Sequence, residues 1–227
     1  MPISTPLSAK VNFNPASPEE HLTVSSYPYL KVIGSLMYAA LGTCPDICLA
    51  VRALAPFAAT FGHDHIEGLK HIMQYLAGCL DHGIMYMMGD GDLVGYTDAN
   101  WANDHANCCS ISGYVFLYAG GAVSWMSKQQ STVAMSSTHA KYITAVEATK
   151  ELVWLCHLIT KLQEDISGST VLHIDNCAAD LLARNPINHA VTKHIDVQYH
   201  YIRECITDGL VTLKLIRTNN MAADILL

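Results

Sequence analysis

The sequence is poor in charge and lacks a long apolar run. Only 15% of its 227 residues are charged, and 13 Lys and Arg against 20 Asp and Glu give a formal net charge of −7. This balance argues against broad affinity for nucleic-acid phosphates. No run of about 18 apolar residues occurs, so we expect no membrane span. The N-terminus lacks the apolar core of a signal peptide, and we expect a soluble, intracellular protein, either cytoplasmic or nuclear.

Paired cysteine motifs are absent as well. The chain has 8 cysteines, but none stands in a CxxC pair and no zinc-finger spacing of Cys and His occurs. This excludes a conventional structural zinc site. Several cysteines lie inside apolar segments, where a free thiol behaves as a small core residue. We therefore expect reduced thiols rather than disulfides.

Apolar residues are abundant, and their spacing divides the chain into three parts. With 51% hydrophobic residues, the chain can bury a substantial core. Residues 1–26 are rich in Pro, Ser and Asn and are expected to form an extended lead. Residues 27–88 carry apolar residues at helical spacing and predict a helical unit with three main helices. Residues 89–227 form the third part.

The apolar period becomes that of strands from about residue 82 onward. The pattern predicts strands at 82–89 and 92–102, a hairpin over 112–128, a short strand at 131–137, a helix at 138–162, a strand at 169–176, helices at 177–185 and 192–209, a strand at 210–218 and the start of a helix at 219–227. Helices between strands favour an α/β fold, a mixed sheet flanked by helices.

Three aspartates stand at the predicted ends of these elements. Asp98 ends one strand, Asp175 ends another, and Asp224 opens the terminal helix. Carboxylates that converge from neighbouring strand ends can hold two hard divalent cations about 4 Å apart for phosphodiester hydrolysis. Each of them could equally be a turn or helix-capping residue.

Longer motifs add a family resemblance. In chain order, IGSLMYAALGTCPDICLAV, GYTDANWAND, GGAVSWMSKQQSTVAMSSTHAKY, TKHIDVQYHYIRE and AADIL resemble the C-terminal part of copia-type retrotransposon polyproteins. The match runs from about residue 28 to the end. It implies that residues 27–88 correspond to the end of a reverse transcriptase and 89–227 to an RNase H-like domain, with a mixed five-stranded sheet flanked by helices. Such domains cut the RNA strand of RNA–DNA hybrids with Mg²⁺ or Mn²⁺.

The resemblance assigns roles position by position. Asp98, Asp175 and Asp224 match the family's metal-binding aspartates, and Asp196 matches a further acid but falls inside a predicted helix and ranks below Asp224. The family motif that usually reads SSTEAEY is SSTHAKY here. Lys141 therefore stands at the position of the catalytic glutamate.

The same motif places His139 where the family has its other acid. Replacing a glutamate by Lys141 moves the local charge by two units, and its ammonium is expected to pair with Asp98 or Asp175. Each charge pair is worth on the order of 4 kcal/mol at about 4 Å and an effective dielectric of ~20. We therefore expect no divalent cofactor in this chain. His139 could bind a softer metal or simply face solvent.

Basic residues of the family pattern are also replaced. Cys44, Cys108, Cys109, Met126 and Val191 stand where related sequences tend to have Arg or Lys. Because phosphate contacts by basic side chains dominate affinity for nucleic acids, we expect binding of an RNA–DNA hybrid to be weak or lost.

Three functions remain open from the sequence. The favoured one is a retrotransposon-derived protein that keeps the fold, has lost metal-dependent cleavage and has been repurposed, for example as a binding or scaffold module. The second is a metal-independent enzyme that uses Asp98, Asp175, His139 and Lys141 for acid–base chemistry on a small organic molecule. The third is a still-active RNase H. The sequence predicts neither a particular ligand nor an oligomeric state.

Overall fold

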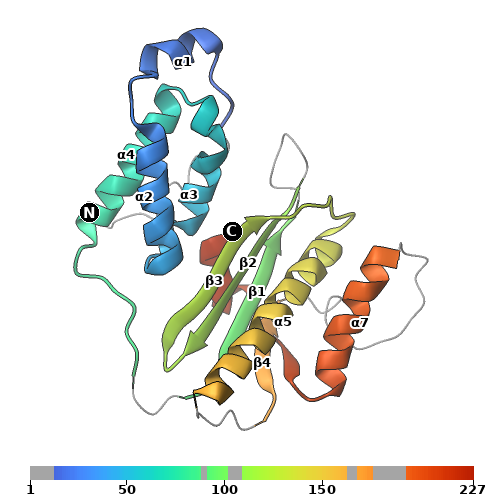
Figure 1. Ribbon diagram of the computed structural model, residues 1–227. Helices are drawn as coiled ribbons and strands as arrows, with labels where there is room; N and C mark the ends of the chain where they lie inside the picture. The colour runs from blue at the N-terminus through green and yellow to red at the C-terminus, as the bar shows by residue number, and fades with distance from the viewer. Residues whose placement is uncertain (1–12, 88–90, 102–108, 163–167, 176–192) are drawn as a thin grey trace. The chain divides into compact units, whose positions relative to one another are not determined.

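The chain forms two compact units, an N-terminal unit of residues Met1–Ile84 and a C-terminal unit of residues Met85–Leu227 (Figure 1). The structure, a computed structural model, describes residues 13–87, 91–101, 109–162, 168–175 and 193–227, with backbone alone at 193–199. Within these residues, no helix combines the length and apolar character needed to cross a membrane.

The N-terminal unit is helical, as its apolar spacing predicts. Its elements are α1 (Pro18–Val24), α2 (Tyr29–Gly42), η1 (Pro45–Ile47), α3 (Cys48–Leu54), η2 (Ala55–Ala59) and α4 (His63–Gly78). Pro45 opens η1, where a proline has no amide hydrogen to leave unbonded. The three predicted helices correspond to α2, to η1 with α3 and η2, and to α4.

The expectation of an extended lead over residues 1–26 is wrong for residues 18–24, which form α1. The Ser17 side chain caps this helix by accepting the Glu20 N–H at 3.2 Å, and Pro18 occupies its first turn. The Ala16 N–H donates to the Thr60 carbonyl at 2.9 Å. A local cap and this long-range contact explain why a polar, proline-rich segment is ordered here.

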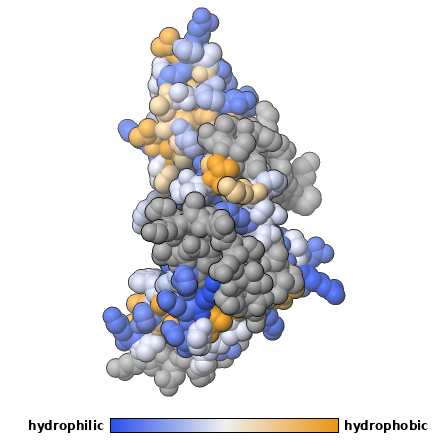
Figure 2. All heavy atoms as spheres, turned by 90° about the vertical axis from the view of Figure 1, so that its right-hand side faces the viewer, coloured by the Kyte–Doolittle hydropathy of each residue, from blue (hydrophilic) through white to orange (hydrophobic). Residues whose placement is uncertain are grey.

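Tyr29 lies at the centre of the core of the N-terminal unit. Its ring stacks on Phe61 at 4.5 Å, and its hydroxyl donates to the Leu54 carbonyl at 2.9 Å. Apolar side chains also reach the surface of this unit, since Leu30 and Tyr38 of α2 are largely exposed. Figure 2 shows exposed apolar residues in orange.

The C-terminal unit is a five-stranded sheet with helices packed on it. Its elements are β1 (Val94–Asn100), β2 (Ile111–Tyr118), β3 (Gly121–Gln129), α5 (Ser137–Lys161), β4 (Thr170–Ile174), α7 (Lys193–Thr207), β5 (Val211–Leu215), η3 (Thr218–Asn220) and η4 (Ala222–Leu226). The strand order is β3-β2-β1-β4-β5. The β1–β2 and β2–β3 pairs are antiparallel, while β1–β4 and β4–β5 are parallel. This mixed sheet flanked by helices confirms the predicted fold class.

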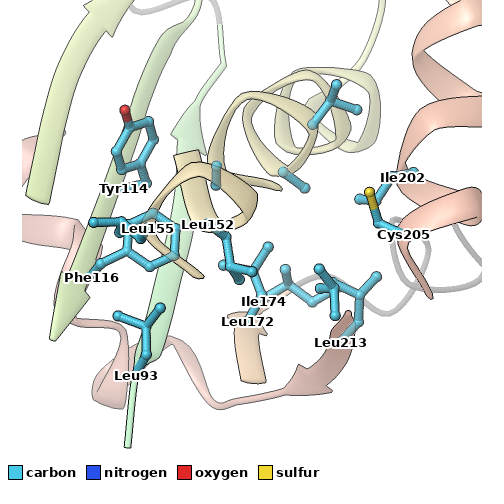
Figure 3. Packing of buried hydrophobic residues seen from close by; sticks show 14 of the residues in the cluster. Leu93, Tyr114, Phe116, Leu152, Leu155, Leu172, Ile174, Ile202, Cys205 and Leu213 are labelled. Carbon is cyan, nitrogen blue, oxygen red and sulfur yellow. The ribbon is translucent and has the colours of Figure 1, made fainter. Parts of the chain in front are cut away.

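One apolar cluster joins the sheet to α5 and α7 (Figure 3). Phe116 and Leu172 from the sheet and Leu152 from α5 are fully buried, and Ile202 of α7 completes the cluster. Figure 1 shows α5 across the sheet with α7 beside it. Burial of one such side chain stabilises a fold by roughly 1.5–3 kcal/mol.

Two predicted strands do not form. Residues 82–87, the described part of the predicted strand 82–89, run without strand structure, and the same holds for residues 131–136. Instead, the Met87 N–H donates to the Ala119 carbonyl at 2.7 Å, and the Tyr86 hydroxyl donates to the Ala122 carbonyl at 2.8 Å. We call Met85–Met87 the strap. The predicted helix at 177–185 lies outside the described residues.

The hairpin between β2 and β3 turns over two residues, Ala119 and Gly120. Both have positive φ, 52° and 76°, as expected for a tight hairpin turn. The next residue, Gly121, is needed for space, because a Cβ there would lie 2.5 Å from the Tyr86 ring and 2.8 Å from the Met85 carbonyl oxygen. The absence of a side chain at Gly121 thus leaves room for the strap to pack against the hairpin.

Candidate functional site

Asp98 and Asp175 are brought together by the pairing of β1 with β4. The parallel register joins Val94 to Val171 and Tyr96 to His173. Continuing this register by two residues places Asp98, in β1, beside Asp175, which directly follows β4. The carboxyl ends of parallel strands meet at one edge of a sheet, so two carboxylates face the same point.

Lys141 reaches this point from the N-terminal part of α5. Its Nζ lies 2.5 Å and 2.6 Å from Asp175 Oδ1 and Oδ2, and 2.8 Å from Asp98 Oδ1. The three side chains are 19%, 7% and 10% exposed for Lys141, Asp175 and Asp98. The ammonium thus bridges both carboxylates in a largely buried setting, whereas the sequence led us to expect a pair with one or the other.

Further hydrogen bonds orient the two carboxylates. Asp98 Oδ1 also accepts the Ala99 N–H at 2.7 Å, and Asp175 Oδ2 accepts the Thr218 hydroxyl at 3.3 Å. Thr218 opens η3, the turn after β5. No sequence motif singled it out, because its contact depends on how the chain folds back after β5.

The environment keeps Lys141 charged. Burial alone would lower its pKa, but hydrogen bonds to Asp175 and Asp98, and the negative charges of both, outweigh burial and raise the pKa above its ordinary value. A protonated amine has no lone pair, so this side chain is a counter-ion and hydrogen-bond donor rather than a nucleophile.

Asp224 is the third aspartate of the site. Its pKa is raised by burial, and then by the negative charge of Asp98, a hydrogen bond with that carboxylate and the charge of Asp175, while Lys141 acts in the opposite direction. The fold therefore gathers all three predicted aspartates and Lys141. The side chain of Asp196 lies outside the described ones.

His139 belongs to the capping structure of α5. Its backbone N–H donates to the Ser136 hydroxyl at 3.1 Å, and its Nδ1 accepts the Met135 N–H at 3.4 Å. The ring is half-buried, and burial lowers its pKa. An acceptor Nδ1 implies the neutral tautomer with hydrogen on Nε2. His139 is thus tied to the helix start rather than facing solvent freely.

The residues present do not fit a divalent metal. Mg²⁺ and Mn²⁺ require the oxygens of Asp98 and Asp175, and those oxygens already surround the Lys141 ammonium at 2.5–2.8 Å. Among the described residues, no group of three or more His, Cys, Asp or Glu could hold a metal ion.

The structure describes three of the five residues expected to stand at basic positions of the family pattern. Met126 packs against the core of the C-terminal unit, whereas Cys44 and Cys109 are half-buried free thiols. Cys108 and Val191 lie outside the described residues. The three of these residues that the structure describes are uncharged and at least half-buried.

Known proteins similar to the chain include transposon polyproteins. It is 40% identical over 229 residues to a retrovirus-related Pol polyprotein from transposon TNT 1-94 of Nicotiana tabacum, covering 99% of the chain and 17% of that protein. It is 35% identical over 228 residues to the corresponding protein from transposon RE1 of Arabidopsis thaliana, covering 97% and 16%. The chain thus spans about a sixth of the length of these curated relatives.

Among solved structures, LC11-RNase H1 isolated from compost is similar over 60% of this chain and 92% of its own, with 13% identity and a TM-score of 0.46. No protein-family model matches the chain.

Proposed function

The chain belongs to the retrovirus-related Pol polyproteins of copia-type transposons, and we propose that it keeps their RNase H-like fold while Lys141 replaces the metal on which hybrid cleavage depends. The protein would act as a repurposed, non-catalytic binding or scaffold module. One observation carries the proposal: the Lys141 Nζ is 2.5–2.8 Å from oxygens of both Asp98 and Asp175. An internal cation held there competes with any divalent ion for the same oxygens.

The magnitude of the effect favours loss of metal binding. A divalent ion at this point would meet a positive charge instead of the negative charge of a glutamate. Each unit of charge contributes on the order of 4 kcal/mol at about 4 Å and an effective dielectric of ~20. Even a fraction of this corresponds to orders of magnitude in affinity.

The other two functions receive less support. Acid–base chemistry by Lys141 needs an amine that can lose its proton near neutral pH, whereas the pKa of Lys141 is raised. An active RNase H would have to displace the ammonium from both carboxylates. For a metal-independent acid–base enzyme, one observation stands in favour: the raised pKa of Asp224, next to Asp98, suits a general acid.

The test compares wild type with Lys141→Glu. Titrations with Mg²⁺ and Mn²⁺ followed by calorimetry, and cleavage of a labelled RNA–DNA hybrid, should give neither binding nor cleavage for wild type. Lys141→Glu should bind Mg²⁺ and Mn²⁺ at least a hundredfold more tightly than wild type, and it should cleave the hybrid.

The matched control is Lys150→Glu. Lys150 lies on the same helix, is half-exposed and pairs with Glu147 at 2.7 Å. Lys150→Glu changes the net charge equally but leaves the site intact, so it should behave like wild type. Metal-dependent cleavage by wild type would overturn the proposal.

A further inference from the structure

The start of α4 in the N-terminal unit is held by a set of contacts that depends on one histidine. His65 is 2% exposed, and its Nδ1 accepts the N–H of Gly62, the residue that caps α4, at 3.0 Å. Within the described residues, Nε2 has no hydrogen-bond partner. Because Nδ1 accepts a hydrogen bond, the ring must be neutral with its hydrogen on Nε2.

The ring lies between two aromatic side chains. Its centroid is 5.3 Å from that of Phe13, in the segment before α1, and 4.5 Å from that of Phe57 in η2. These two aromatic rings favour a neutral imidazole, because they give a positive one little solvation. His65 thus joins the N-terminal segment to the body of the helical unit.

Residues 13–24 make further contacts with the same helix start. Glu20 Oε1 accepts the His63 N–H at 2.9 Å, and His21 Nδ1 donates to the Phe61 carbonyl at 2.9 Å. A carboxylate at a helix N-terminus is favourable because it satisfies a free N–H and faces the positive end of the helix dipole. A Cβ at Gly62 would clash with the Glu20 side chain, so that position must stay small.

A cavity lies beneath this segment. Its volume is about 390 Å³, and its lining includes Phe13, Glu20, Asp64 and His65. Glu20 and Asp64 make part of this lining polar. A cavity of this size and polarity can admit water and hence bring protons to the buried ring.

From this arrangement we propose that residues 13–24 form a latch on the start of α4, closed while His65 is neutral and released when its imidazole takes up a proton. Protonation places a hydrogen on Nδ1, which can then no longer accept the Gly62 N–H. It also places a positive charge between Phe13 and Phe57. Both effects weaken the contacts between residues 13–24 and the start of α4.

The charged groups that act on His65 come from α4 and from α1. Burial lowers its pKa, while Asp64 of α4 and Glu20 of α1 raise it, and the balance lies below the ordinary value of 6.5. The pKa of His65 is lower in the closed latch than after release, so the released state binds a proton more readily. The closed latch therefore loses stability as the pH falls below about 6.5. At neutral pH it is closed.

Amide hydrogen exchange of the intact chain tests the latch. The readouts are the Gly62 and His63 amides, which bond to His65 and Glu20. After correction for intrinsic exchange rates, wild type should lose several-fold and at most about tenfold protection at both amides between pH 7.5 and 5.5, the limit for one group with a released pKa of 6.5. Unchanged protection would overturn the proposal.

Two variants separate the histidine from its surroundings. In His65→Asn, an amide oxygen near the Nδ1 position can accept the same N–H but does not titrate, so protection should persist at pH 5.5. In His63→Asn, which alters an exposed histidine of the same turn, the wild-type loss should remain. Equal loss in His65→Asn and wild type would show that another group releases the latch.

If His65→Asn fails to fold, wild type alone still decides. An NMR titration should give one midpoint for the His65 ring and the Gly62 amide. Different midpoints would contradict the latch.

Discussion

Lys141 carries its charge on a flexible side chain, and this lets one residue of α5 contact carboxylates from two strands. The motif around it predicted proximity to the aspartates, because a lysine at a glutamate position inherits its surroundings. The sequence could not foresee that the ammonium would contact both Asp98 and Asp175, or that Thr218 would join them. Those contacts depend on strand register and on a distant turn.

Asp224 offers a test at the same scale. Its pKa is raised above the ordinary 3.8, so its ionised form destabilises the folded C-terminal unit, and stability is lost as the pH rises through the folded pKa. Asp224→Asn should therefore raise the melting temperature at pH 7, with the gain shrinking as the pH is lowered toward about 4. Circular dichroism melts measure this.

The control for that experiment is Asp208→Asn, at an exposed position after α7. It removes the same charge away from the site and should leave the melting temperature nearly unchanged at every pH. A melting temperature for Asp224→Asn below that of wild type at pH 7 would contradict the expectation.

Among the elements, helices were predicted better than strand ends. The apolar spacing placed the helix at 138–162 within one residue of α5 (Ser137–Lys161). The segment 82–89 contains the short apolar run 84–88, which predicts a strand, yet Met85–Met87 form the strap instead. An apolar run indicates that side chains are partly buried, but it does not indicate whether a neighbouring strand edge is free to pair.

The strap makes a prediction about Gly121. A Cβ added there would lie 2.5 Å from the Tyr86 ring and 2.8 Å from the Met85 carbonyl oxygen. Gly121→Ala should destabilise the C-terminal unit by about 1–3 kcal/mol, because the strap must move away from the hairpin. Urea unfolding followed by tryptophan fluorescence measures the change.

Gly91→Ala is the matched control, since Gly91 belongs to the C-terminal unit and a Cβ there meets nothing within 4 Å. It should not lower stability. If Gly121→Ala is as stable as wild type, the strap does not contribute to the stability of the C-terminal unit.

For the molecule as a whole, each unit has its own buried core. Ile72 is fully buried in the N-terminal unit and Leu172 in the C-terminal unit. The sequence predicted the division into a helical part and a sheet part, because the period of its apolar residues changes near residue 82. The predicted boundary lay between residues 88 and 89, whereas contacts divide the chain between Ile84 and Met85.

Two separate cores should give two separate unfolding transitions. Leu172→Ala should destabilise the C-terminal unit by about 2–5 kcal/mol, and Ile72→Ala should do the same for the N-terminal unit. All 3 tryptophans, Trp101, Trp125 and Trp154, belong to the C-terminal unit, so their fluorescence reports on that unit, while circular dichroism reports on both. A single substitution that shifts both transitions equally would refute this independence.

The ammonium that bridges Asp98 and Asp175 is tethered to the chain, and a tethered counter-ion cannot be diluted away. Its effective concentration beside the carboxylates is set by the geometry of α5 rather than by the surrounding solution. A bound ion exchanges with its surroundings, so its occupancy follows supply. Here the charge balance of Asp98 and Asp175 should stay the same in a magnesium-rich medium and after treatment with a chelator.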